Sequence, residues 1–275
     1  IFAARGDALW TDMTAASFTS GGTSYAYEGT IHDDAALRGM VTGGLEVRYP
    51  WLFTALNSSH VIEPIAQIFV RPNEQYAGRL PNEDSQAFVF DATNLFERDK
   101  FSGFDRIEGG TRANLGFRYN GTFNNGYGVR AIAGQSFHLA GENSFASYDL
   151  LNVGADSGLE SDRSDYVAMA AFDAPIGLSL SSSLRLDKDN FEINRSETGI
   201  SYSDRRINGR LSYTQVKAQP KYGYNEDRDI IQASGSLRMD DNWSLFGAIN
   251  YDINGKFAAE RRIGIAYQDE CTILT

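Results

Sequence analysis

The chain has 275 residues, of which 42% are hydrophobic, 12% aromatic and 22% charged. This aromatic content excludes a disordered chain, and no stretch approaches the roughly 18 consecutive apolar residues that a membrane-spanning helix requires. A formal net charge of −11 argues against a nucleic-acid-binding protein, because a phosphate backbone attracts clustered lysine and arginine.

Alternation of apolar and polar residues with a period of two begins at the start of the chain. Residues 2–10 place Phe, Ala, Gly, Ala and Trp on one face, with Arg5 and Asp7 on the other. Because successive side chains of a strand point to opposite faces, this pattern predicts a strand with one apolar and one polar face. We expect about twelve to fourteen such strands and no helix of three turns. The same alternation recurs at 45–49, 112–119, 178–187, 207–213, 231–237, 243–251 and 263–267.

The segments between the strands are of two kinds. Tight-turn sequences rich in Asn, Asp and Gly lie at 124–126, 240–242 and 254–255, where Gly and Asn tolerate positive φ. Long polar connections span 11–34, 71–86 and 141–165. Their alternation predicts an all-β, antiparallel, up-and-down meander with short turns at one end and elaborate loops at the other.

Alternation alone permits a soluble sandwich or barrel as well as a transmembrane barrel, which turns its apolar face to lipid. Two features favour the membrane. The apolar faces are rich in Ala, Gly and single aromatics, whereas a soluble core must reach close-packed density. The opposite faces, expected to line a polar lumen, carry charges and amides: Arg5, Asp7, Glu46, Arg48, Glu63, Gln67, Arg112, Arg118, Arg130, Arg185 and Arg238.

Strand length and aromatic placement point the same way. The alternating runs are roughly 9 to 14 residues long, against the roughly 9 to 11 that a tilted membrane crossing needs and the roughly 5 or 6 of a typical soluble strand. Aromatic residues near strand ends predict the girdles of a membrane barrel: Trp10, Tyr49, Trp51, Tyr119, Tyr127, Phe172, Tyr213, Trp243, Tyr251 and Tyr267.

Residues 60–110 are too irregular for strand pattern alone. Pro64 removes a ladder donor inside an apolar strand, which predicts an edge or a bulge there. The stretches IEP-x-AQ at 62–67, PNEDS at 81–85, NLF at 94–96, FSGFDR at 101–106 and GIAYQDEC at 264–271 resemble the C-terminal barrel of the lipopolysaccharide-assembly protein (LptD) family. The resemblance covers roughly residues 36–275 and is most specific at 94–119.

The resemblance implies a translocon that inserts lipopolysaccharide into the outer leaflet of the Gram-negative outer membrane. In that family a lipoprotein plugs the lumen of a very large barrel, a periplasmic bridge delivers lipopolysaccharide, and a lateral gate releases it. No hydrolysis takes place, so we expect neither an enzyme nor a cofactor. Residues 1–275 are expected to form one barrel segment, about half of a larger wall, without the family's periplasmic jellyroll domain and gate strands, and no export leader is visible.

The resemblance also marks individual residues. It implies that Cys271 forms a disulfide with a cysteine outside this segment, although a small residue at a turn is the plainer interpretation. We expect Asp105 and Arg106 to form an ion pair that holds a loop inside the lumen. The family-motif residues expected in the lumen or loops are Pro64, Asn94, Phe96, Phe101, Gly103, Asp105 and Arg106.

Other chemistry is weaker. Three histidines are too scattered for a zinc site. Ser136 and His138 share a strand face, as an outer-membrane lipid hydrolase would require, but a polar lumen-facing pair is favoured. Acidic stretches at 82–84 and 226–229 could bind divalent cations, although solvated loops are the default. A porin-like or receptor-like barrel for small solutes is the alternative function.

Four cations of the irregular stretch have several possible partners. Arg71, Arg98, Lys100 and Arg106 could each pair with lipid phosphate, with a plug protein or with nearby carboxylates.

Overall fold

The computed structural model describes residues 1–11, 17–20, 23–26, 34–80, 82–147, 154, 157–220 and 225–274, among which no α-helix occurs. No helix in these ranges is long and apolar enough to span a membrane. The sixteen strands are β1 Phe2–Thr11, β2 Ser17–Ser20, β3 Thr23–Ala26, β4 Asp34–Arg48, β5 Trp51–Ala55, β6 Ser58–Val70, β7 Thr111–Phe123, β8 Gly128–Ala140, β9 Tyr166–Asp173, β10 Leu178–Leu186, β11 Ile193–Ser203, β12 Ile207–Val216, β13 Arg228–Arg238, β14 Trp243–Asp252, β15 Phe257–Gln268 and β16 Ile273–Leu274.

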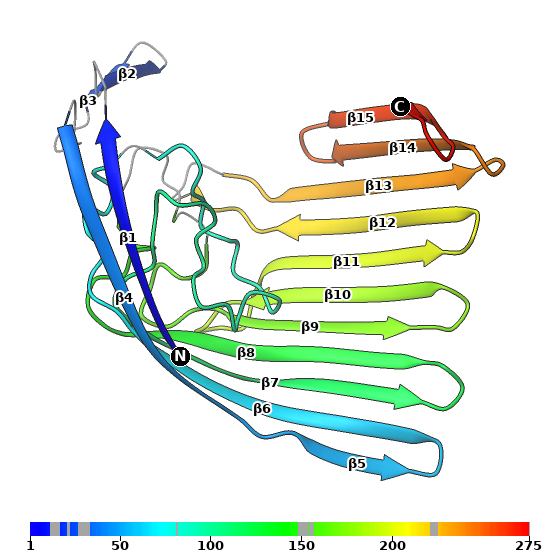
Figure 1. Ribbon diagram of the computed structural model, residues 1–275, viewed down its shortest axis with the longest axis horizontal. Helices are drawn as coiled ribbons and strands as arrows, with labels where there is room; N and C mark the ends of the chain where they lie inside the picture. The colour runs from blue at the N-terminus through cyan, green and yellow to red at the C-terminus, as the bar shows by residue number, and fades with distance from the viewer. Residues whose placement is uncertain are drawn as a thin grey trace.

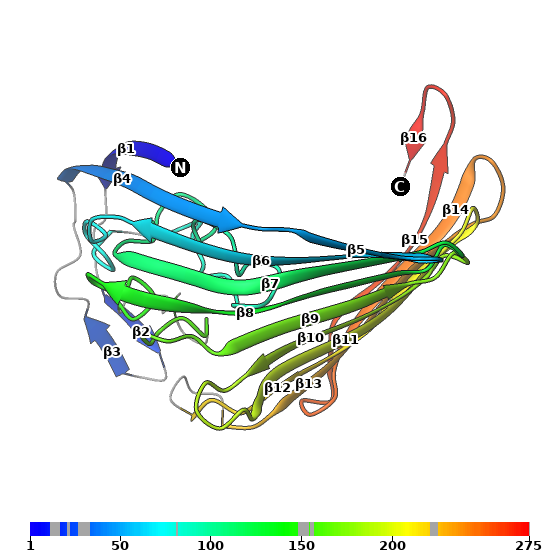
Figure 2. The same ribbon diagram turned by 90° about the horizontal axis from the view of Figure 1, so that it is seen from below.

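Fourteen of these strands form one antiparallel sheet in which, from β6 onward, strands consecutive in sequence are neighbours in space (Figure 1). The order is β1-β4-β6-β7 and then consecutively to β16, while β5 also pairs with β6, and β2 and β3 form a separate hairpin. Viewed from below, the sheet is a curved wall (Figure 2). Within the described residues β1 and β16 lie at its two edges and do not pair with each other, so the wall is open. The predicted all-β antiparallel meander is therefore confirmed.

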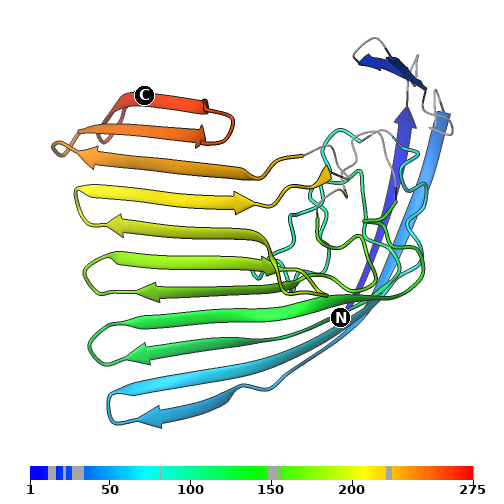
Figure 3. The same ribbon diagram turned by 180° about the vertical axis from the view of Figure 1, so that it is seen from behind.

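The two ends of the wall differ, as the sequence predicts (Figure 3). Short connections of residues 124–127, 174–177, 204–206, 239–242 and 269–272 lie at one end, here called the turn end. The opposite end, the loop end, carries the connections 71–110 and 141–165. The tight turn at 254–255 does not follow this division, because it lies at the loop end, where Asn254 Nδ2 donates to Asp227 O.

The two faces of the sheet carry the alternation in the sense expected of a membrane wall. On β4, Leu37 is 77% exposed while its neighbour Arg38 is 4% exposed. On β7, Leu115 is 48% exposed while Asn114 is fully buried. A soluble sandwich would bury the leucines and expose the polar residues. We call the apolar side the outer face and the polar side, on which the long loops pack, the inner face.

The buried apolar core lies between the long loops and the inner face rather than between two sheets. Phe101 and Phe145, from different loops, stack with their ring centroids 4.5 Å apart. Aromatic rings are exposed on the outer side, and these include Trp10, Tyr49, Trp51, Phe172, Tyr213 and Trp243. The core cluster consists of Phe90, Ala92, Leu95, Phe101, Phe145, Leu159 and Val167.

Candidate functional site

The candidate site is the connection between β6 and β7, residues 71–110, which packs on the inner face together with parts of the connection 141–165. We call residues 71–110 the inner loop. It contains three of the sequence motifs and lies at the loop end of the wall (Figure 1). Its fold depends on backbone capping, an apolar anchor and buried ion pairs, which are described in turn.

The motifs at 82–85 and 101–106 lock onto each other through reciprocal hydrogen bonds. The carboxylate of Asp84 accepts from the backbone N–H groups of Phe104 (2.9 Å) and Asp105 (3.1 Å). In return, Asp105 Oδ2 accepts from the N–H groups of Glu83 (2.6 Å) and Asp84 (3.0 Å). These N–H donors hold the pKa of Asp84 below its usual value. Asp84 and Asp105 therefore each cap the backbone of the other's segment.

Gly103 makes this lock possible. Its φ is +69°, a conformation that L side chains rarely adopt. A Cβ atom built there would lie 2.5 Å from the carbonyl oxygen of Asp84. The glycine in the FSGFDR motif is thus required by both backbone conformation and close approach.

The NLF motif anchors the inner loop to the wall. Asn94 Nδ2 donates to Val89 O (2.9 Å) and fixes the local turn. Leu95 is fully buried against two glycines on the inner face, Gly116 of β7 and Gly134 of β8. A Cβ atom built on Gly116 would lie 3.1 Å from Leu95 Cδ2, and one built on Gly134 would lie 2.6 Å from it. The carbonyl of Phe96 accepts from Gln67 Nε2 on β6 (3.2 Å). Because these two neighbouring positions lack side chains, the leucine can pack directly against the backbone of the sheet.

The ion pair expected between Asp105 and Arg106 is wrong. Arg106 instead pairs with Glu74, with Nε donating to Oε1 at 2.7 Å and Nη2 to Oε2 at 3.0 Å, and both residues are buried. Arg106 Nη2 also donates to the carbonyl of Ser144, which joins the two long connections. The arginine does hold the loop folded, as expected, but its partner lies 32 residues away in sequence.

Glu108 lies at the centre of a second group of buried charged side chains. Arg112 on β7 donates to its carboxylate at 2.5 Å, and Arg71 lies 3.4 Å away. Burial opposes ionisation of Glu108, but Arg112, Lys100 and Arg71 outweigh it and lower its pKa. Burial lowers the pKa of Lys100 to about 8, although Glu108 acts in the other direction. Of the alternatives for these cations, Arg71 and Arg106 therefore pair with nearby carboxylates, whereas Lys100 Nζ donates to the backbone carbonyl of Glu97 (2.9 Å).

Side chains of β1 and β4 donate hydrogen bonds to the backbone of the inner loop at Phe104 and Asp105. Arg38 on β4 donates to the carbonyls of Phe104 (2.7 Å) and Asp105 (2.5 Å), and Arg5 on β1 donates to Phe104 O at 2.5 Å. Asp7 lies 2.8 Å from Arg38 and fixes its guanidinium. The loop therefore spans from β1 to β9 across the inner face.

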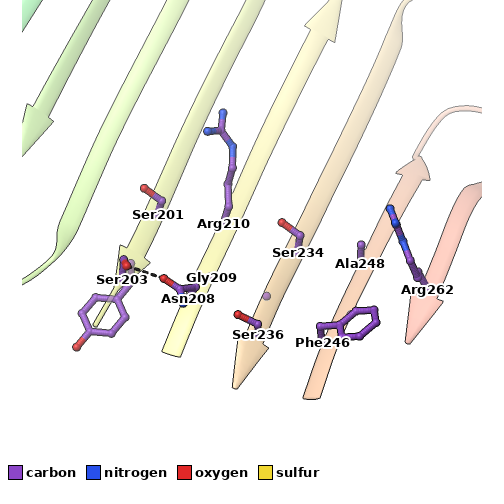
Figure 4. Close-up of a pocket in the computed structure, with 13 residues that line it drawn as sticks. Ser201, Ser203, Asn208, Gly209, Arg210, Ser234, Ser236, Phe246, Ala248 and Arg262 are labelled. Atoms are coloured by element: carbon purple, nitrogen blue, oxygen red, sulfur yellow. Dashed lines mark hydrogen bonds between the residues drawn. The ribbon is translucent and has the colours of Figure 1, made fainter. Parts of the chain in front are cut away.

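Beyond the inner loop, the described residues leave most of the inner face of β11–β15 uncovered. Serines, glycines and alanine of β11–β14 line a shallow groove of about 470 Å³ (Figure 4). Arg210, Phe246 and Arg262 also line this groove, among residues with small side chains. We call the inner face of β11–β15 the bare region and the inner face of β6–β9 under the loops the covered region.

Six of the seven family-motif residues come together in the inner loop: Asn94, Phe96, Phe101, Gly103, Asp105 and Arg106. Pro64 lies apart, because it pairs with Phe117 in the outer-face register of β6 and β7. It sits where β4 ends and β5 begins, since β4 pairs as far as Ile65 and β5 from Ile62. The edge or bulge expected at Pro64 is therefore not found: β6 pairs on both sides, its register with β7 is unbroken, and the ladder with β4 and β5 is missing only between Ile65 and Ile62.

The other candidates also have definite positions. Cys271 is an exposed free thiol in the β15–β16 turn and is the single cysteine of the chain, so a disulfide would need a cysteine from elsewhere. Ser136 Oγ donates to Asn114 Oδ1 (2.8 Å), whereas His138 Nε2 meets Gly141 O (3.0 Å), so the two do not bond to each other. The described ranges hold no group of three or more His, Cys, Asp or Glu that could hold a metal ion.

Sequence reasoning missed Glu74 and Glu108, and it did not single out Arg38. Glu74 and Arg38 form their contacts with residues distant in sequence, so no local spacing marks them. Glu108 contacts Arg112 four residues away, but its burial depends on the fold of the whole loop. The sequence signal for these residues is the high density of charged residues within 71–112. Together with the inner-face position of Arg112, which the alternation predicts, this density indicates a network of buried ion pairs.

Comparison with known proteins agrees with the motif resemblance. The model of the family described as LptD, LPS transport system D, matches residues 1–243. A curated relative named LPS-assembly protein LptD from Saccharophagus degradans is 28% identical over 204 residues, covering 70% of this chain and 23% of the relative. One of the same name from Acinetobacter baumannii is 27% identical over 203 residues, covering 70% of this chain and 22% of the relative. The matches thus span about a quarter of the relatives' length.

Proposed function

We propose, because the chain belongs to the LptD family, that it forms part of the wall of a Gram-negative outer-membrane barrel that inserts lipopolysaccharide into the outer leaflet. The observation that carries this proposal is the sidedness of the wall. Leucines such as Leu37 and Leu115 are exposed on the outer face while charged groups are buried on the inner face. Such a surface suits acyl chains outside and water inside.

The open edges support a larger barrel. An unpaired strand edge is not stable in the hydrocarbon layer, because its N–H and C=O groups find no partner there. The described sheet ends at β1 and β16. We therefore propose that residues 1–275 are one segment of the barrel wall and that further strands close it, in keeping with the share of the relatives that the matches cover.

The bare region supports a role for partners inside the lumen. Its side chains are mostly small and polar, and Arg210 and Arg262 are exposed there, whereas the covered region is already filled by the protein's own loops. A lipoprotein plug would contact the bare region, and a periplasmic bridge would deliver lipopolysaccharide from the turn end. In this account the barrel binds and guides lipid and catalyses no hydrolysis.

Cys271 fits the same account at the turn end. Its thiol is exposed beside Asp269, whose carboxylate accepts from the Cys271 N–H (2.9 Å). We propose that it pairs with a cysteine outside this segment. Mass spectrometry of the non-reduced protein from cells should find Cys271 cross-linked, and a wholly free thiol there would contradict this pairing.

The function is tested in cells that depend on this protein. Depletion should reduce lipopolysaccharide on the cell surface and cause it to accumulate inside, and expression of the intact gene should restore it. A porin-like protein would instead leave surface lipopolysaccharide unchanged and alter solute uptake. In planar bilayers, the proposed assembly barrel should conduct little once its lipoprotein is bound, whereas a solute channel should stay open.

A further inference from the structure

A cavity of about 200 Å³ lies between residues 89–93 of the inner loop and the inner face of β10–β12, at the border between the covered and the bare regions. Loop residues Asp91 and Thr93 form one side, and the serines of β10 together with Arg195, Glu197 and Arg210 form the other. The cavity is smaller than the roughly 300–1,000 Å³ that encloses a drug-sized ligand. It would therefore take a single charged group and part of its carrier.

The arginines of the cavity are not equally occupied. Arg185 lies 3.5 Å from Asp165, and Arg210 lies 3.6 Å from Glu197. No ion pair or hydrogen bond of the Arg195 side chain occurs within the part of the chain that the structure describes. Arg195 also stands directly opposite Arg185 in the β10–β11 register, so two like charges adjoin on one face. Adjacent like charges are unfavourable unless an anion offsets them. Asp165 offsets the charge of Arg185, whereas no ion pair among the described residues offsets that of Arg195.

The rest of the lining suits hydroxyl groups. Ser181, Ser183 and Thr93 can donate or accept, and Glu197 can accept from a ligand hydroxyl. Asp91 is less available, because its Oδ1 accepts from Thr93 N (2.7 Å), Thr93 Oγ1 (2.6 Å) and Asn94 N (3.2 Å). Guanidinium groups bind phosphate bidentately, whereas carboxylates and hydroxyls bind sugar hydroxyls.

We propose that this cavity binds a phosphorylated sugar, with Arg195 as the main phosphate ligand and Ser183 and Glu197 contacting the sugar. Arg210 also borders the open groove of the bare region (Figure 4), so the cavity adjoins that groove. The sugar phosphate could come from the saccharide of lipopolysaccharide or from a free sugar phosphate. The first source rests on the proposed function, whereas the chemistry of the cavity does not.

The test is a binding titration of the full-length protein in detergent with glucose 6-phosphate, glucose and inorganic phosphate. Wild-type protein should bind glucose 6-phosphate more tightly than either other probe. The substitution Arg195→Gln should weaken that binding about tenfold to a hundredfold, because a charge-assisted contact is lost. Arg205→Gln, an exposed arginine in the β11–β12 turn, is the matched control and should leave binding unchanged.

Two further arms complete the test. Should Arg195→Gln impair folding, Arg195→Lys keeps the charge without the bidentate geometry and should weaken binding severalfold. Equal affinity of the wild type and the Arg195 variants for glucose 6-phosphate would overturn the proposal. Deacylated lipopolysaccharide should bind, and lose binding after phosphatase treatment, if lipopolysaccharide is the source. If it fails to bind while glucose 6-phosphate still does, the site stands and its ligand is a free sugar phosphate, independent of the proposed function.

Discussion

The covered and bare regions belong to one sheet and follow one alternation, yet their charges are in different environments. In the covered region the Glu108 side chain is 1% exposed and lies among three cations. In the bare region the side chains of Glu197 and Arg210 are 36% and 59% exposed, and they pair at 3.6 Å. The strands place polar groups on the inner face in both regions. The loops decide which of them lose water, and therefore which ion pairs the fold depends on.

The largest difference is expected for the carboxylates. Glu108→Gln leaves Arg71 and Arg112 buried without a counter-charge, which should lower the free energy of unfolding by about 3–5 kcal/mol. Glu197→Gln in the bare region removes an exposed pair and should cost about 1 kcal/mol or less. Urea unfolding of both variants in detergent, followed by tryptophan fluorescence, measures this. Equal losses would mean that the inner loop does not seal its ion pairs from water.

A pH titration separates the regions through their lysines. With its pKa lowered to about 8 in the folded state against 10.5 when unfolded, Lys100 takes up a proton on unfolding between those values. Stability should therefore rise between pH 8 and 10.5, on the order of 3 kcal/mol, and stay flat just below pH 8.

The variant Lys100→Met should lack this rise. Lys217, beyond the end of β12, behaves oppositely, because its hydrogen bond to Glu192 raises its pKa. Its contribution is complete below pH 10.5 and is lost as the pH rises through the folded value, so Lys217→Met should differ from the wild type in the opposite sense. An identical pH profile for the wild type and Lys100→Met would show that Lys100 is not buried.

Two glycines sharpen the comparison at the level of the backbone. Gly103→Ala in the inner loop forces a Cβ onto Asp84 at positive φ and should cost about 2 kcal/mol. Gly209→Ala on β12 meets nothing within 4 Å and should change the free energy of unfolding by less than about 0.5 kcal/mol. Limited proteolysis of the inner loop should also increase in Gly103→Ala alone. Full protection of that variant would contradict the lock between residues 82–85 and 101–106.

The smallest expected difference concerns the aspartate caps. Asp84 accepts from Phe104 and Asp105 in the covered region, and Asp240 accepts from Asn242 (2.9 Å) and Trp243 (2.8 Å) in a turn of the bare region. Backbone N–H donors lower the pKa of both carboxylates. Asp84→Asn and Asp240→Asn should therefore remove a similar, small stabilisation that the wild type loses as the pH falls below 3.8. A large loss of unfolding free energy in only one of the two variants would show that the two caps do not contribute equally to stability.

How far the sequence predicts this fold depends on how local the signal is. The outward position of Leu211 beside the inward Arg210 follows from the strand period, which each strand carries by itself. The folding of 101–106 onto the inner face follows from its motif. The partner of Arg106 does not, since the carboxylate of the neighbouring Asp105 accepts instead from the N–H groups of Glu83 and Asp84. Glu74, 32 residues earlier, meets Arg106 only after the inner loop has closed on the wall.

The central claim is that the apolar side of the wall faces lipid and the polar side faces water. Spin labels at Leu211→Cys and Arg210→Cys, each in the full-length protein with all its other cysteines replaced by serine and reconstituted in bilayers, test it on two adjacent residues of β12. The label at 211 should relax faster with oxygen, which partitions into lipid, and the label at 210 faster with a water-soluble nickel chelate. The reverse pattern, or equal access of the nickel chelate to both labels, would contradict the account.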